Sequence, residues 1–163
     1  MEKNPRLHLP SARAIAAAVC LLLPVLCGGC GKSGKASARL NETDLKIMGQ
    51  YDQIRAALAS DDLRTAKKTA AALAETLKPA VADAPASPMQ QSAEALANAT
   101  ALDRCRQVFK AMSAEAIRMT NGAQGYYVIN CPMTPEGDWV QTDTKVDNPY
   151  MGKIMRDCGA VKK

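Results

Sequence analysis

The stretch LDRCRQVFKAMSAEAIRM (102–119) decides the fold, because its apolar residues recur at intervals of three and four. These residues share one face of an α-helix, and they are Leu102, Cys105, Phe109, Met112, Ala116 and Met119. Asn121 and Gly122 follow directly, and glycine readily adopts the left-handed conformation that ends a helix. The stretch therefore predicts an amphipathic helix that buries one face in a core.

Two further helices are predicted at the start of the folded region. From Thr43 onward, apolar residues recur at intervals of four, three and four, namely Ile47, Tyr51, Ile54 and Leu58. Ser60-Asp61-Asp62 interrupts this pattern, and we interpret its two adjacent carboxylates as helix-capping groups rather than as a catalytic pair. A second amphipathic pattern runs from Leu63 to Leu77 and is stopped by Pro79.

A short third helix is predicted to begin at Ser87-Pro88-Met89-Gln90 and to reach about Thr100. Serine suits the N-cap, proline the first helical position, and Gln90 the third position of a capping box. After Gly125 the sequence changes to a β-prone run at residues 126–130 and then to turn-rich segments. The predicted fold is mainly α, a small bundle of about four helices with an irregular C-terminal cap that contains a short strand or hairpin.

The N-terminus has the pattern of a secretory signal. Three basic residues precede an apolar run at 14–26, and Cys27-Gly28-Gly29-Cys30 follows, which resembles the lipobox of bacterial lipoproteins. We expect residues 1–29 to be a lipoprotein signal peptide, with an ordinary cleaved signal as the alternative. Lipid on Cys30 would then anchor a periplasmic protein to a membrane of the cell envelope, with residues 30–42 as a flexible tether and residues 43–163 as the folded domain.

Composition argues against two classes of function. Removing residues 1–29 takes three basic and one acidic residue from totals of 21 and 16, which leaves 18 against 15 and a charge of +3. This excess is too small to predict nucleic-acid binding. The only histidine is His8, and no phosphate-binding glycine loop or nucleophile elbow occurs. Beyond the predicted signal, the cysteines 105, 131 and 158 form no Cys-x-x-Cys pair. The sequence therefore predicts a protein that is not an enzyme.

Sulfur is concentrated near the C-terminus in an ordered series of motifs. They are Cys131-Pro132-Met133, Gly137-Asp138-Trp139, Asn148-Pro149-Tyr150-x-Gly152 and Met155-x-x-Cys158-Gly159. With Tyr51-x-x-Ile54 and Arg106-x-x-Phe109 upstream, the series resembles a bacterial domain of unknown function. That domain occurs alone in exported proteins and attached to copper and silver efflux adaptors of the CusB type. The resemblance covers about Tyr51 to Gly159 and implies a metal-related role outside the cytoplasm, with an envelope metal-efflux component as partner.

Two interpretations of the C-terminal sulfur remain open. Thiolates and thioethers favour Cu(I), and a four-sulfur site for this cofactor would consist of Cys131, Met133, Met155 and Cys158. A helical turn over residues 150–158 would place Met151, Met155 and Cys158 on one face. Alternatively, an oxidising compartment would favour a structural disulfide between Cys131 and Cys158. The leading hypothesis is an envelope protein that binds or transfers a soft metal, and the alternative is a non-catalytic interaction module locked by that disulfide.

Three other C-terminal and core residues have simpler interpretations. Trp139 and Tyr150 are expected to anchor the C-terminal segment on the bundle, with a role in lining a pocket as the alternative. Cys105 lies on the apolar stripe of its helix, so we expect a buried free thiol there.

Overall fold

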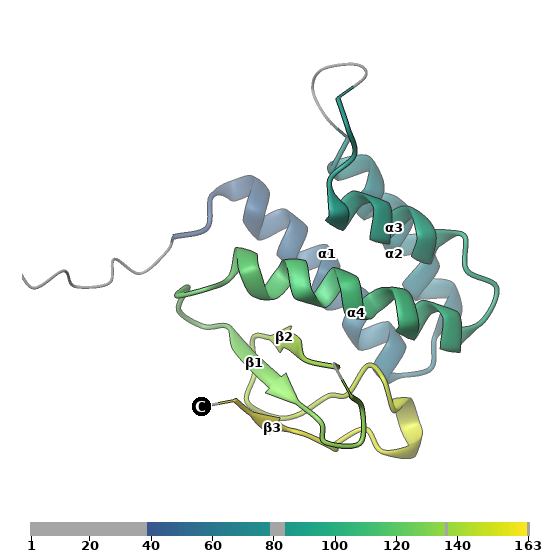
Figure 1. Ribbon diagram of the computed structural model, residues 1–163, viewed down its shortest axis with the longest axis vertical. Helices are drawn as coiled ribbons and strands as arrows, with labels where there is room; N and C mark the ends of the chain where they lie inside the picture. The colour runs from purple at the N-terminus through teal and green to yellow at the C-terminus, as the bar shows by residue number, and fades with distance from the viewer. Residues whose placement is uncertain (1–38, 79–83, 136, 163) are drawn as a thin grey trace, which may run out of the picture. The chain divides into compact units, whose positions relative to one another are not determined.

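The computed structural model describes residues 39–78, 84–135 and 137–162, and its framework is four α-helices (Figure 1). In chain order they are α1 (Glu42–Ala59), α2 (Leu63–Thr76), α3 (Pro88–Ala97) and α4 (Leu102–Met119). Each apolar periodicity in the sequence corresponds to one of them, and α4 has the bounds of the stretch that decided the fold. The prediction of a mainly α fold with about four helices is confirmed.

Side chains cap the starts of α1, α2 and α3, whereas Ala101 before α4 makes no side-chain capping hydrogen bond. Asp62 is the N-cap of α2, where its carboxylate accepts the backbone N–H of Thr65 at 3.0 Å and the Thr65 hydroxyl at 2.7 Å. Ser87 caps α3 by accepting the N–H of Gln90 at 3.1 Å. The Gln90 side chain does not complete a capping box, because it donates instead to Glu94 one turn further along, at 2.9 Å. That part of the prediction was wrong.

Asp61 is not a capping residue but part of a junction between distant segments. Its backbone adopts the left-handed region, with φ at 57°, and its carboxylate lies 2.5 Å from Nη2 of Arg106 on α4. The Arg106 guanidinium also donates to the carbonyl groups of Leu58 at 3.3 Å and Pro149 at 3.1 Å. One arginine therefore joins the end of α1, the helix α4 and the C-terminal segment.

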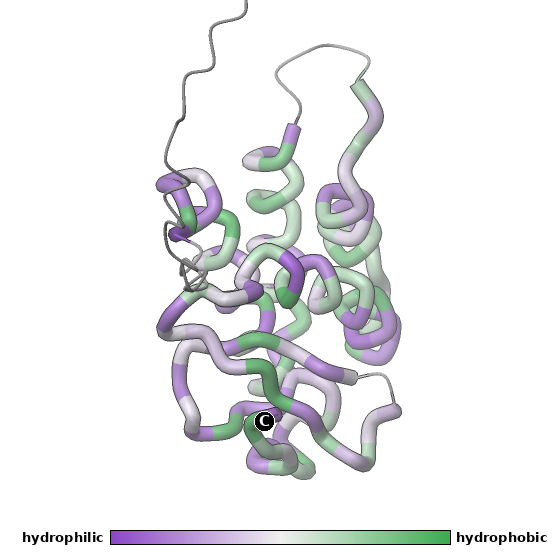
Figure 2. Tube along the Cα trace, turned by 60° about the vertical axis from the view of Figure 1, so that its left-hand side comes forward, coloured by the Kyte–Doolittle hydropathy of each residue, from purple (hydrophilic) through white to green (hydrophobic). Residues whose placement is uncertain are grey.

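Consecutive helices pack against each other, and α1 also contacts α4. Each helix turns its apolar side inward, so hydrophobic and hydrophilic residues alternate along the helical turns in Figure 2. The largest fully buried side chains of the bundle include Tyr51, Ile54, Leu58, Leu73, Leu96, Phe109 and Met112. Cys105 is a buried free thiol on α4, as expected from its place on the apolar stripe.

Residues 127–162, which we name the cap, form the small C-terminal layer. Strands β1 (Tyr127–Asn130), β2 (Trp139–Gln141) and β3 (Ala160–Val161) make an antiparallel sheet of order β2-β1-β3. The sheet lies beside α4 (Figure 1), and β2 contacts that helix. The expected helical turn over residues 150–158 is reduced to one 3-10 turn, η1 (Gly152–Ile154). The N–H of Lys153 donates to the Asp61 carboxylate and the carbonyl of Arg156 accepts the N–H of Asn148, so these groups are not available for a longer helix.

A buried group of hydroxyls joins the cap to the helices. The Tyr51 hydroxyl on α1 lies 2.9 Å from Oγ of Ser113 on α4 and accepts the backbone N–H of Val140 on β2 at 3.2 Å. The Tyr150 hydroxyl lies 3.3 Å from the same Ser113 oxygen and 3.1 Å from the carbonyl of Asp138. Burial away from water is the main reason that the pKa of Tyr51 is raised to about 12.

Aromatic rings form a continuous contact beside these hydroxyls. Tyr51 stacks on Phe109 with ring centroids 5.1 Å apart, and Phe109 contacts Tyr150 at 5.9 Å. Tyr150 then meets Trp139 edge-on, also at 5.9 Å. The rings therefore connect α1 through α4 to β2 in one apolar layer.

The N-terminal predictions, the signal peptide at residues 1–29 and lipid on Cys30, lie outside the described residues. In the described ranges, no helix is both long and apolar enough to cross a membrane.

Replacing Tyr51 by phenylalanine should destabilise the fold by about 1 to 2 kcal/mol, because the N–H of Val140 would lose its acceptor in a buried place. Urea unfolding followed by circular dichroism would measure this difference. The matched control is Tyr127→Phe, since Tyr127 is exposed on β1 and its hydroxyl should contribute little. Equal stability of the two variants would contradict the structural role of the Tyr51 hydroxyl.

Candidate functional site

The two C-terminal cysteines are joined to each other. Cys131, directly after β1, and Cys158, just before β3, form a disulfide with their Cα atoms 5.8 Å apart. Cys131 is fully buried, whereas Cys158 is partly exposed. The bond closes a segment that spans β2, the following loop and η1, so it holds the whole cap together.

The methionines of the four-sulfur set lie at the surface. Met133 is 62 % exposed and Met155 is 37 % exposed, whereas Met151 is partly buried against the core. In the part of the chain that the structure describes, no group of three or more His, Cys, Asp or Glu residues could hold a metal ion. The oxidised cap therefore presents two exposed thioethers and no free thiolate at this end.

Trp139 and Tyr150 lie inside the cap rather than at its surface. The indole N–H of Trp139 donates to the side-chain carbonyl of Gln141 at 2.9 Å, and both rings are buried. Asn148, also buried, accepts the N–H groups of Tyr150 and Met151 and donates to the carbonyl of Cys158 at 2.7 Å. These contacts position Tyr150 against the helices.

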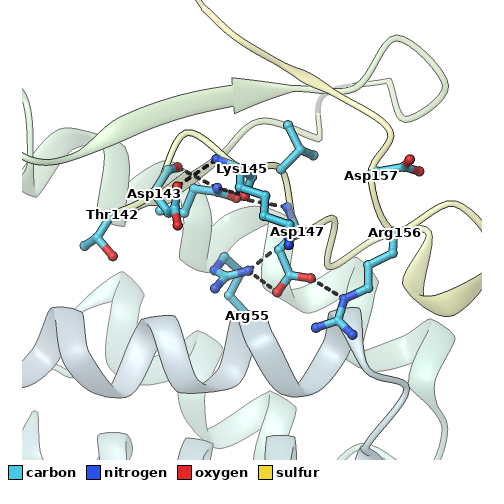
Figure 3. Close-up of a pocket in the computed structure, with 9 residues that line it drawn as sticks. Arg55, Thr142, Asp143, Lys145, Asp147, Arg156 and Asp157 are labelled. Carbon is cyan, nitrogen blue, oxygen red and sulfur yellow. Dashed lines mark hydrogen bonds and ion pairs between the residues drawn. The ribbon is translucent and has the colours of Figure 1, made fainter.

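A charged pocket of about 510 Å³ opens where the cap meets α1 (Figure 3). Its walls come from α1, from the loop after β2 and from the turn that precedes Cys158. We name it the cap pocket, and its lining residues are Arg55, Gln141, Thr142, Asp143, Lys145, Val146, Asp147, Arg156 and Asp157.

Asp147 lies between two arginines in the cap pocket. Arg55 donates from Nη1 to the Asp147 carboxylate at 2.7 Å and to its backbone carbonyl at 2.9 Å. Arg156 binds the other carboxylate oxygen through Nε. Arg55, whose side chain is only 9 % exposed, also pairs with Asp52 on α1 at 2.7 Å. The carboxylate of Asp147 therefore bridges α1 and the C-terminal turn.

These ion pairs shift the protonation of the groups involved. Partial burial opposes ionisation of Asp147, but hydrogen bonds from Arg156 and Arg55 outweigh it and lower the pKa of this carboxyl. Burial likewise disfavours the charged form of Arg55, yet its contacts with Asp52 and Asp147 raise the pKa of the guanidinium. Asp147 and Arg55 therefore both stay ionised at neutral pH.

The helical part of the chain is similar to a known sequence family. Residues 47–126 match the family model described as protein of unknown function, DUF3347. The DUF3347 match spans most of α1 and all of α2, α3 and α4, and it ends before β1. No curated protein and no solved structure matches the chain significantly.

The DUF3347 match therefore includes Arg55 but none of the cap residues that bear sulfur. Sequence reasoning missed Arg55, Lys145, Asp147 and Arg156 as a group, because they are far apart in the chain. One signal was present: Arg55 follows Tyr51 by four residues, so it lies next to the buried stripe of its helix, where a cation needs a partner. The sequence does not show that this partner is Asp147.

The Asp147 carboxylate should make stability depend on pH. Its pKa is lower in the folded chain than in the unfolded chain, so the unfolded state binds more protons in acid. The stabilisation should be complete above the unfolded pKa of about 4 and be lost as pH falls through the lower folded value. Asp147→Asn should be less stable than wild type at pH 7, and the difference should shrink toward pH 3.

Urea midpoints measured from pH 7 to pH 3 would check this expectation. Glu75→Gln is the control for a general effect of removing a paired carboxylate, since the Glu75–Lys78 pair on α2 is exposed. A stability difference between wild type and Asp147→Asn that stayed constant over this range would contradict it.

Proposed function

We propose that the chain is an exported, lipid-anchored and non-catalytic interaction module that docks on another envelope protein through its disulfide-locked cap. The observation that carries this proposal is Ile154, an apolar side chain that is 87 % exposed. It stands in the exposed segment 153–156, which we name the knob. Met155, next to Ile154, is 37 % exposed, and adjacent exposed apolar side chains on a rigid support are typical of a protein contact.

Contacts with Asp61, Arg106 and Asn148 fix the backbone of the knob. Gly152, with φ at +56°, brings the backbone so close to the Asp61 carboxylate and Arg106 that a Cβ would collide with both. The N–H of Lys153 donates to Asp61 at 3.3 Å. At the other side, Asn148 donates its backbone N–H to the carbonyl of Arg156 at 2.7 Å. Because little order must be gained on binding, a fixed knob can dock with less loss of entropy.

The chemistry of the knob suggests the partner surface. Ile154 and Met155 supply apolar contact area, and the cations Lys153 and Arg156 flank them. A complementary partner would offer an apolar pocket with an acidic rim. The predicted lipid on Cys30 and the tether that follows would keep the domain near a membrane of the periplasm, and disulfides persist in that compartment.

Site-specific crosslinking would test docking by the knob. A photoreactive amino acid at position 154, in the full chain expressed in its own cells, should give one saturable adduct of defined mass. The matched control is position 45, because Leu45 on α1 is another exposed apolar residue, at 53 %. Lys153→Glu should weaken the adduct by reversing a charge beside Ile154, and it leaves the Arg156–Asp147 pair intact. Adducts of equal yield at both positions, or none at position 154, would contradict the proposal.

A second candidate function is binding or transfer of Cu(I) by the reduced cap. Reduction of the disulfide adds two electrons and two protons and would leave two thiols side by side at Cys131 and Cys158. Met155 is close in the fold to this pair, since its carbonyl accepts the N–H of Cys158 at 3.1 Å, and Met133 is two residues from Cys131. The resemblance to domains of CusB-type efflux adaptors supports an envelope metal-efflux component as partner.

Anaerobic titration with Cu(I) against a chromogenic chelator would test this candidate. The reduced chain should bind one ion, and both the oxidised chain and the Cys131→Ser, Cys158→Ser double variant should lose at least about 10-fold in affinity, because thiolates are the strongest soft ligands of the set. Cys105→Ser is the control, since Cys105 is buried in the bundle. Equal competition by the reduced and oxidised chains would exclude the cap thiols as ligands.

A further inference from the structure

Hydrogen bonds from Gln141 preorganise the loop that lines the cap pocket. Gln141, buried in its wall, uses both ends of its amide to fix the surrounding loop. Its nitrogen donates to the carbonyl groups of Asp143 at 2.6 Å and Lys145 at 2.7 Å. Its oxygen accepts the indole N–H of Trp139 and, at 3.3 Å, the N–H of Asp147. The loop is therefore preorganised, which favours ligand binding because little entropy remains to be lost.

Not every cation of this pocket has a carboxylate partner, although three cations and three carboxylates line it. Arg55, Lys145 and Arg156 surround Asp147 in Figure 3, and both carboxylate oxygens of Asp147 are already occupied by the two arginines. Among the described residues, no carboxylate lies within ion-pair distance of the Lys145 ammonium, and no acceptor is bound by the terminal nitrogens of Arg156. Donors with full positive charge thus remain available to a ligand.

The other two carboxylates of the pocket limit what that ligand can be. Asp143 and Asp157 line the same pocket, so they would repel a ligand with two or more negative charges even though Lys145 and Arg156 attract it. Their oxygens can instead accept N–H groups, and Thr142 adds a hydroxyl. A single planar carboxylate attached to amide groups matches this arrangement, since guanidinium groups bind carboxylates through paired hydrogen bonds.

We propose that the cap pocket binds the C-terminal carboxylate of a peptide chain. The carboxylate lies against Lys145 and Arg156, above the Arg55–Asp147 pair, and the preceding peptide N–H groups face Asp143 and Asp157. The volume of about 510 Å³ accommodates two to three residues. The pocket shares Arg156 with the knob but does not include Ile154, so loss of peptide binding in Lys145→Gln and loss of crosslinking at position 154 are distinguishable.

Two peptides that differ in one group would test the proposal on the purified, oxidised full chain. N-acetyl-alanyl-alanine carries the carboxylate, and its C-terminal amide does not. Titration followed by amide NMR shifts should give binding of the acid, with the amide weaker by at least about 10-fold through loss of charge-assisted hydrogen bonds. Acetate and inorganic phosphate, tested in the same way, distinguish a peptide site from a site for free anions.

Variants assign the binding to the pocket. Lys145→Gln should weaken binding of the acid peptide by about 5-fold or more, because it removes an unpaired cation without breaking an ion pair. Arg118→Gln is the control, since Arg118 is an exposed cation on α4. Equal binding of acid and amide, an unchanged affinity in Lys145→Gln, or binding of acetate or phosphate as tight as that of the acid peptide would each overturn the proposal.

Discussion

The hydroxyl of Tyr51 is the contact on which the arrangement of helices and cap depends. It lies on α1, meets Ser113 of α4 and accepts a backbone N–H from β2, so three elements distant in sequence share one buried oxygen. A buried N–H without an acceptor is costly, and hydrophobic packing alone would not fix the register of a short strand on a helix. The aromatic contacts of Phe109 and Tyr150 supply the apolar area, while the hydroxyl specifies where β2 must lie.

The sequence predicted the helices well because their signals are local. The apolar stripe of α4 and the N-cap residue Asp62 of α2 are local signals, and the structure has both. Asp61 was misjudged for the opposite reason, since its partner Arg106 is 45 residues away and nothing near Asp61 indicates it. The cap pocket could not be predicted for the same reason: Arg55 and Asp147 meet only after the cap has folded onto α1.

The two interpretations of the cap sulfur are linked by chemistry. Cysteines close enough to form a disulfide are also, when reduced, close enough to bind one soft ion together. A sequence specifies this proximity but not the oxidation state, which depends on the compartment. The disulfide also restrains the knob, because Cys158 follows Arg156, the last residue of the knob, by two positions. Its reduction would therefore loosen the surface features as well as release the thiols.

Arg106 and the cap pocket show two different uses of charged side chains. Arg106 binds Asp61 and two backbone carbonyls, and Gly152 closes over it, so its donors are consumed by the fold. Around Asp147, by contrast, both carboxylate oxygens already accept hydrogen bonds, while the Lys145 ammonium and the terminal nitrogens of Arg156 still have donors without an ion-pair partner in the described part of the chain. A purely structural ion pair uses its donors within the fold, as Arg106 does. Donors left unpaired beside a preorganised loop are therefore what distinguishes the proposed ligand site from an ion pair that only holds the fold.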